Sequence, residues 1–160
     1  MIAQLWTTTL GQIWMTFFVS MVPVIELRGA IPLATGAGLP LQYALPIAIV
    51  GNLLPIPFII LFIKKIFAWM RKTSRWLNKI VDKLEAKAEK NKPKIQRYAF
   101  WGLFLFVAIP LPGTGAWTGA LVAAMLDMPL KKAMPSIILG VLGAAVIVTL
   151  VSTGAFAVFS

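Results

Sequence analysis

Four long runs without a single charged residue dominate this chain. They cover residues 1–25, 29–63, 98–126 and 133–160. A helix that crosses the hydrocarbon core of a bilayer needs only about 20 apolar residues. Since 59% of the residues are hydrophobic and the mean hydropathy is +0.87, the sequence predicts an all-α integral membrane protein. At 160 residues, we expect a single membrane domain over 1–160.

The chain contains no cysteine and no histidine. Disulfides, thiolate or imidazole zinc sites and nucleophile schemes based on these residues are therefore excluded. Outside residues 64–97 the only carboxylates are Glu26 and Asp127. We expect no metal, no cofactor and no enzymatic activity. The first 25 residues lack the basic start and cleavage site of a signal peptide, so we expect them to belong to the fold.

Proline and glycine punctuate two stretches of the chain in the same way. At an offset of 89 residues, Pro40, Pro46 and Gly51 recur as Pro129, Pro135 and Gly140, and at an offset of 87, Pro23 recurs as Pro110. The spacing indicates an internal repeat, with repeat 1 over about residues 5–63 and repeat 2 over about 98–158. The second copy needs two extra residues. Apolar segments that Gly and Pro interrupt at corresponding places are typical of transporter binding sites.

Most of the net charge of +10 lies in one linker, residues 64–97, which holds 12 basic and 3 acidic residues. A basic arm can bind nucleic acid, but Lys and Arg beside membrane spans usually mark a cytoplasmic loop. We expect anionic lipids of the inner leaflet as its partner, and no nucleic acid. Apolar residues at helical steps predict one amphipathic helix of about six turns on that leaflet. They are Ile66, Met70, Leu77, Ile80 and Leu84.

The charges also predict a topology. With the linker in the cytoplasm, the run 41–63 crosses the membrane, and Lys131 and Lys132 lie inside. Residues 99–126 then number 28, too few for two crossings, so we expect a re-entrant hairpin.

The matching hairpin of repeat 1 turns around Glu26 and Gly29. We therefore predict two inverted repeats, each a re-entrant helical hairpin plus a transmembrane helix, joined by the cytoplasmic linker, with both termini outside. The alternative is a bundle of four spanning helices with proline kinks.

Glu26 and Arg28 are the only ionisable residues in the apolar part of repeat 1. Charged residues inside a membrane are costly and usually functional. We expect Arg28 to hold an anionic headgroup or substrate, and Glu26 to pair with it or to carry a proton. Two alternatives remain open: a structural ion pair that closes the hairpin, and a pair at the outer surface.

The second turn, within residues 108–119, is uncharged and rich in proline and glycine. Backbone amides at the start of the returning helix would point a positive dipole end at the membrane centre. We expect an anion between those amides and Arg28, with hydroxyls from Thr114 and Thr118 and a stacking or gating surface from Trp117. The alternative is a tight turn whose small residues serve close packing.

Asn52, a polar residue deep in an apolar run, completes the candidate site. The candidate substrate- or proton-binding residues are Glu26, Arg28, Gly29, Pro32, Asn52, Pro110, Pro112, Gly113, Thr114, Gly115, Trp117 and Thr118. We expect Asp127, which precedes Lys131 and Lys132, to lie at the interface.

Residues 26–33, Glu-Leu-Arg-Gly-Ala-Ile-Pro-Leu, and 108–119, Ala-Ile-Pro-Leu-Pro-Gly-Thr-Gly-Ala-Trp-Thr-Gly, resemble the family of small multidrug export proteins. That family is similar to the DedA/VTT superfamily, whose members carry two opposed re-entrant hairpins and include transporters or scramblases for lipids such as undecaprenyl phosphate. The resemblance implies a prokaryotic inner-membrane location. It also implies that Glu26 and Arg28 form the charged motif of the first hairpin, and Pro110 and Gly113 the turn motif of the second. The second-hairpin arginines typical of DedA proteins are absent; Gly115 and its neighbours stand there.

Three functions fit these patterns. The leading hypothesis is a transporter or flippase that moves an anionic amphiphile, such as a lipid phosphate, through a midplane site between two opposed hairpins. The second is proton-coupled export of small molecules through Glu26, and the third is a membrane scaffold without transport. Because two full spans can hardly enclose a pathway alone, we expect a homodimer.

Overall fold

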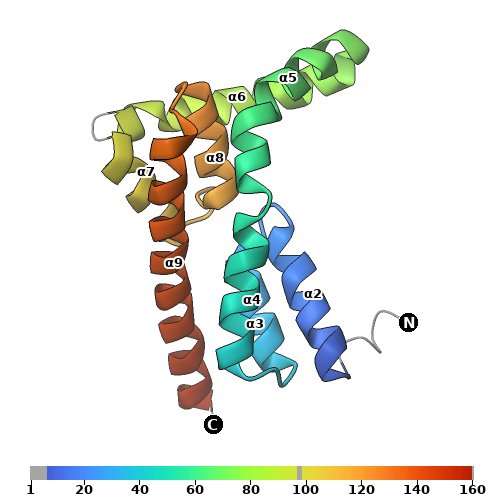
Figure 1. The fold of residues 1–160 in the computed structure, drawn as a ribbon, viewed down its shortest axis with the longest axis vertical. Helices are drawn as coiled ribbons and strands as arrows, with labels where there is room; N and C mark the ends of the chain where they lie inside the picture. Colours follow the sequence, from blue (N-terminus) through green and yellow to red (C-terminus); the bar gives the residue numbers. More distant parts are fainter. Residues whose placement is uncertain (1–6, 97–98, 160) are drawn as a thin grey trace.

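The computed structural model describes residues 7–96 and 99–159, and every regular element in this part is an α helix (Figure 1). The helices are α2 (Thr9–Met21), α3 (Glu26–Gly36), α4 (Leu41–Leu53), α5 (Ile56–Thr73), α6 (Arg75–Gln96), α7 (Ala99–Ala108), α8 (Ala116–Met125) and α9 (Leu130–Phe159). This confirms the all-α prediction for the described residues. The predicted position of the termini concerns residues 1–6 and 160, which lie outside the described part.

Two stretches of the described chain are long and apolar enough to cross a membrane: Leu41–Thr73 and Leu130–Gly154. The helices that precede them are much shorter. In the first half, α2 has 13 residues and α3 has 11. In the second half, α7 and α8 have 10 residues each, about half the length that a spanning helix needs. Each half therefore consists of a short helical hairpin followed by a long helix.

Proline breaks the first long helix but not the second. Pro55 separates α4 from α5 because it has no backbone N–H to continue the ladder of hydrogen bonds. At the corresponding depth α9 runs on without interruption, although it contains Pro135 near its start. The first long stretch is consequently interrupted near its middle, between α4 and α5.

The predicted linker helix is two helices, so this expectation was wrong in detail. The basic end of α5 runs to Thr73, Ser74 is extended with φ −158° and ψ 143°, and α6 begins at Arg75. The Ser74 hydroxyl accepts a hydrogen bond from the amide of Trp76 at 3.3 Å. Serine favours such helix starts because its oxygen satisfies an amide that lacks a helical partner. The apolar periodicity continues through Ser74, which is why the sequence predicted one helix.

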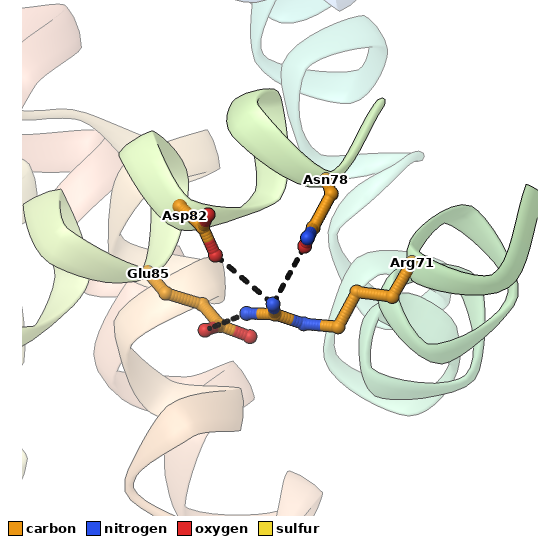
Figure 2. A network of polar contacts seen from close by, with 4 residues as sticks. All are labelled: Arg71, Asn78, Asp82 and Glu85. Atoms are coloured by element: carbon orange, nitrogen blue, oxygen red, sulfur yellow. Dashed lines mark hydrogen bonds and ion pairs between the residues drawn. The ribbon is translucent and has the colours of Figure 1, made fainter. Parts of the chain in front are cut away.

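Arg71 pins the two linker helices together (Figure 2). From α5, its guanidinium lies 2.9 Å from a carboxylate oxygen of Asp82 and 2.6 Å from one of Glu85, and it donates to Asn78 at 2.7 Å. Desolvation lowers the pKa of Arg71, but the hydrogen bonds and charges of Glu85 and Asp82 raise it overall. Arg71 engages two of the three acidic residues of α6, and the seven Lys and Arg residues of that helix leave it with a net positive charge.

Glycines let each hairpin pack tightly on its long helix. A Cβ on Gly51 of α4 would lie 2.5 Å from the carbonyl oxygen of Phe17 in α2 and would also clash with Ser20. A Cβ on Gly140 of α9 would lie 2.6 Å from Cβ of Val107 in α7 and 3.0 Å from the carbonyl oxygen of Phe104. Helices in membranes use small residues for such close contacts.

The two hairpins approach each other from opposite ends of the molecule (Figure 1). In this view α2 and α3 lie beside the lower half of the first long helix, whereas α7 and α8 lie in the upper half, beside α9 and α5. Helix α6 crosses the upper end and contacts both α7 and α8. The turns of the two hairpins therefore meet in the middle of the bundle.

Candidate functional site

Glu26 joins the first hairpin to the start of α8. Its carboxylate is buried, with the residue only 4% exposed. Oε1 accepts a hydrogen bond from the amide of Trp117 at 3.0 Å, and Oε2 accepts one from the amide of Ala116 at 3.3 Å. These are the first amides of α8, where the helix dipole is positive. The carboxylate therefore caps a helix of the other hairpin.

The close approach of Glu26 requires a glycine at position 115. Gly115 has φ +128°, and a Cβ built there would lie 2.7 Å from Oε1 and 2.8 Å from Cδ of Glu26. Such contacts are too short for any side chain. Glu26 itself has φ +49°, a conformation that is uncommon outside glycine and persists where surrounding contacts hold it. Here the two bonds to α8 provide those contacts.

Arg28 joins the first hairpin to the end of α7. Its Nη2 donates to the carbonyl oxygens of Val107 at 3.0 Å and Ile109 at 3.2 Å. Its Nη1 donates to the carbonyl oxygen of Leu111 at 3.1 Å. Nη1 also donates to the carbonyl oxygen of Thr114 at 3.3 Å and to its Oγ1 at 3.1 Å. Carbonyls at a helix C-terminus carry partial negative charge, so the guanidinium suits this position.

Trp117 makes a contact in the opposite direction. Its indole Nε1 donates to the carbonyl oxygen of Met21 at 3.1 Å, and Met21 is the last residue of α2. Each hairpin thus satisfies a helix end of the other. We call this set of contacts the hairpin interlock; its residues are Met21, Glu26, Arg28, Val107, Ile109, Leu111, Thr114, Gly115, Ala116 and Trp117.

The hairpin interlock lies near the middle of both long helices. Gly51, against which the end of α2 packs, is close to the centre of residues 41–63, the uncharged stretch that α4 and the start of α5 share. In the second half, a Cβ on Gly143 would lie 3.2 Å from that of Ala108, the last residue of α7. Gly143 is 13 residues into α9, about 20 Å along its axis.

The structure brings together the charged motif of the first hairpin with several residues of the second. Glu26, Arg28, Thr114, Gly115 and Trp117 all belong to the hairpin interlock. The sequence predicted an anion between the α8 amides and Arg28, and the carboxylate of Glu26 occupies those amides. As a result, the helix end that was expected to face substrate faces a side chain of the same protein.

Other predicted residues shape the surroundings. Pro110, Pro112 and Gly113 form the exposed part of the second turn, and Gly113 has φ +83°. Gly29 lies in the first turn of α3, where a Cβ would meet Ile25. Pro32 lies inside α3. These residues set the backbone and contribute no side-chain polar contact to the hairpin interlock.

Thr118 and Asn52, the two remaining polar residues of the predicted site, lie in different environments. Thr118 is half-buried on α8, and the hairpin interlock includes no contact from it. Asn52 is fully buried one residue after Gly51, and neither its Oδ1 nor its Nδ2 has a hydrogen-bond partner among the described residues. A buried amide without partners is rare in folded proteins, so Asn52 stays a candidate for a ligand or water at the level of the hairpin turns.

The backbone carbonyls that Arg28 binds were not predicted. Carbonyl oxygens belong to every residue, and nothing in the sequence distinguishes those of Val107, Ile109 and Leu111. Asp127, expected at the interface, forms an exposed ion pair with Lys64 that ties the α8–α9 turn to α5.

No protein of described function and no solved structure gives a significant match to this chain. A sequence family does match: residues 26–147 fit the family described as "Putative small multi-drug export protein". The matched region contains the first long helix, the part of α9 up to residue 147, and every charged or turn residue of the hairpin interlock. Apolar helices and family membership together identify a membrane protein. The chain belongs to the small multidrug export protein family.

Proposed function

We propose that this protein is a transporter that moves an anionic amphiphile across the inner membrane of a prokaryote, with the hairpin interlock as its central site and gate. The carrying observation is that Glu26 and Arg28, the only charges in the apolar part of the first half, each hold a helix end of the second hairpin. Separating the hairpins would expose two helix ends and two charges near the centre of the bundle.

Corresponding contacts in the two halves support an inverted repeat. Gly51 packs on Phe17 as Gly140 packs on Phe104, and the offsets of 89 and 87 residues are those of the proline pattern. The turns before the long helices also correspond. The amides of Gly38 and Leu39 bond the carbonyls of Thr35 and Ala34, and at an offset of 89 those of Asp127 and Met128 bond Ala124 and Ala123.

Charge placement supports opposed re-entrant hairpins. Lys64 of α5 contacts Asp127, which follows α8, and Lys131 and Lys132 belong to the first turn of α9. Helix α6 crosses this end of the bundle and contacts both α5 and α8 (Figure 1). Basic residues gather on the cytoplasmic side of membrane proteins. In the proposed topology, α7 and α8 therefore enter from the cytoplasm, α2 and α3 enter from outside, and α6 lies on the inner leaflet.

The substrate proposal follows from what the α8 amides hold. A pair of amides at a helix start that binds a carboxylate in one state can bind a phosphate or carboxylate of the substrate in another. In the proposed cycle the substrate anion replaces the Glu26 carboxylate, and Arg28 turns from the carbonyls of the second turn to the substrate. The DedA/VTT resemblance points to the same substrate class, lipid phosphates.

The test is transport of a fluorescent lipid phosphate in reconstituted vesicles. We expect the wild-type protein to make inner-leaflet probe accessible to an external quencher, and Arg28→Gln to abolish this. Glu26→Gln, which weakens the competitor for the α8 amides, should lower the probe concentration needed for half-maximal transport. Lys131→Gln removes an equal charge at the end of the bundle and serves as the control. Equal rates for Arg28→Gln and Lys131→Gln would contradict the proposed site.

Proton-coupled export is a second candidate, because Glu26 is a buried carboxylate. Protonation would weaken its two bonds to α8 and thereby release the second hairpin. In vesicles with a trapped pH indicator, this candidate requires drug-driven proton flux that Glu26→Gln abolishes. If neither lipid phosphate nor protons move, the scaffold hypothesis is favoured over both.

A further inference from the structure

The side-chain amide of Asn52 is buried without a partner in the protein. Asn52 is 0% exposed, and neither its Oδ1 nor its Nδ2 forms a hydrogen bond with any described residue. An unpaired buried amide destabilises a fold, and the hydrocarbon of a membrane offers it no partner either. The amide at this position therefore calls for a reason other than stability.

The second half of the chain carries an apolar residue at the corresponding position. At the offset of 89 that pairs Gly51 with Gly140, Asn52 corresponds to Val141. Val141 is buried as completely as Asn52 and belongs to the main apolar core. Packing against the neighbouring helices thus requires no amide at this position, and the amide is a feature of the first half alone.

Asn52 lies in the last turn of α4, where backbone oxygens lack their helical partners. In a continuous helix the carbonyls of Gly51 and Leu53 would accept hydrogen bonds from the amides of residues 55 and 57. Both of these residues are proline and have no N–H. The negative end of the α4 dipole lies at the same turn. Three uncharged oxygens of consecutive residues, the two carbonyls and Oδ1 of Asn52, are therefore available at the negative end of a helix.

A buried hydroxyl adjoins this turn. Oγ of Ser20 in α2 occupies the place that a Cβ on Gly51 would need, and Ser20 is fully buried. The hydroxyl donates its proton to the carbonyl oxygen of Phe17 at 2.7 Å. Its oxygen keeps lone pairs, so a further uncharged oxygen lies beside the end of α4.

The type and charge of these atoms indicate the ligand. Oxygen ligands suit hard cations, but sites for Mg²⁺ and Ca²⁺ are built with carboxylates, and none of these oxygens belongs to one. Interrupted membrane helices offer such carbonyls and helix C-termini to monovalent cations. The expectation that the chain holds no metal rested on the lack of His, Cys and clustered carboxylates, none of which a monovalent cation needs.

We infer that the last turn of α4 binds a monovalent metal cation, Na⁺ or K⁺, through Oδ1 of Asn52 and the carbonyl oxygens of Gly51 and Leu53. A water molecule on the ion would accept a hydrogen bond from Nδ2. None of these three residues belongs to the hairpin interlock, and the inference does not depend on the proposed transport.

Thermal unfolding of the purified full chain in detergent tests the inference, with Na⁺, K⁺ and choline compared at one ionic strength. We expect one of the two metal ions to raise the unfolding midpoint of the wild type in a saturable manner relative to choline. Asn52→Val, which introduces the residue type of the second half, should lose most of that shift. Thr149→Val is the matched control and should keep it, because Oγ1 of Thr149 in α9 is also buried without a partner.

Two further comparisons keep the inference falsifiable. In choline, Asn52→Val should unfold at a higher temperature than the wild type, because it removes an unpaired amide. Asn52→Asp, which places a carboxylate at the same position, should reach half of its shift at a several-fold lower ion concentration. A lower midpoint of Asn52→Val in choline, or an ion shift as large as that of the wild type, would overturn the inference.

Equal midpoints of the wild type in Na⁺, K⁺ and choline would also overturn it and would indicate that Asn52 binds water only. Binding is read here from stability and not from transport. The failure of the cation site is therefore distinguishable from the failure of the proposed function, which the vesicle assay with Arg28→Gln decides.

Discussion

The carboxylate of Glu26 fills the space that a side chain on Gly115 would need. The two residues are 89 positions apart, the offset of the proline pattern, and they meet where the hairpins cross. One half of the chain therefore carries a carboxylate, and the other half carries a glycine whose missing side chain leaves room for it. A symmetric pair of glutamates would place two like charges together, so the difference between the halves is necessary for the contact.

Gly115→Ala should destabilise the protein by displacing Glu26 from the α8 amides. We expect a loss of about 2–4 kcal/mol, from a strained φ and an unpaired buried carboxylate. Thermal unfolding in detergent measures the effect. Gly38→Ala is the matched control: its φ is +94°, but no atom lies within 4 Å of the added Cβ. It should show the cost of strain alone, and similar losses in both variants would argue against the displacement.

Arg28→Lys should keep the fold but weaken the hairpin interlock. A single ammonium cannot reach the five acceptors that the planar guanidinium spans. We expect a loss of about 1.5–3 kcal/mol and faster proteolysis in the second turn. Lys132→Arg, at an exposed position near the start of α9, is the control, because it exchanges the same two residue types outside the hairpin interlock. Unchanged protease resistance in Arg28→Lys would refute the role of the planar guanidinium group.

The double variant Glu26→Gln with Arg28→Gln separates structure from transport. Glu26 and Arg28 bind atoms of the second hairpin and not each other. We therefore expect the double variant to be less stable than the wild type but still to fold, because glutamine can keep some of these hydrogen bonds. We also expect no lipid phosphate transport, because Arg28 is the proposed anion ligand. Full transport by a well-folded double variant would exclude this role and favour a purely structural one.

Gly51→Ala and Gly140→Ala should destabilise to a similar degree, since each glycine lets a long helix contact its hairpin. Overpacking at such contacts costs about 1–3 kcal/mol. Gly154→Ala provides the control within α9, because nothing lies within 4 Å of the added Cβ. Unfolding midpoints of the three variants in one detergent give the comparison. A silent Gly140→Ala would contradict the correspondence of the halves.

Topology can be checked with two cysteines, one before and one after the membrane crossing of the first long helix. We expect Lys90→Cys in α6 to react only from the cytoplasm and Gln42→Cys at the start of α4 only from outside. A membrane-impermeant maleimide applied to whole cells and to inverted vesicles distinguishes the sides. Reaction of both from the same side would overturn the inverted arrangement.

The sequence predicted the parts of the site better than their partners. The uncharged run 99–126 is too short for two membrane crossings, and this length predicted a short hairpin. Glu26 and Arg28 were predicted as site residues because they are isolated charges in an apolar segment. Apart from the Thr114 hydroxyl, the partners of those charges are backbone atoms 79 to 91 residues away in the sequence, and such contacts leave no periodic pattern. The helix break at Ser74 was missed because its serine cap is a local signal that the longer apolar periodicity outweighed.

The strained residues were also beyond prediction. Left-handed φ values usually belong to glycine, yet here Val24, Glu26 and Asp127 adopt them. Tertiary contacts impose this conformation at Glu26, and at Asp127 the turn repeats the geometry of Gly38. Propensity alone assigns neither position.

The break at Pro55 has a mechanical consequence. Below it, α4 packs on α2 and α3; above it, α5 packs on α8. The two segments of one span thus carry opposite hairpins, while α9 is an uninterrupted rod beside them. Bending at Pro55 sacrifices no helical hydrogen bond, because proline has no N–H to lose. Because α4 contacts the first hairpin and α5 contacts the second, we expect a change of angle at Pro55 to move the hairpins relative to each other and to strain the contacts of Glu26 and Arg28.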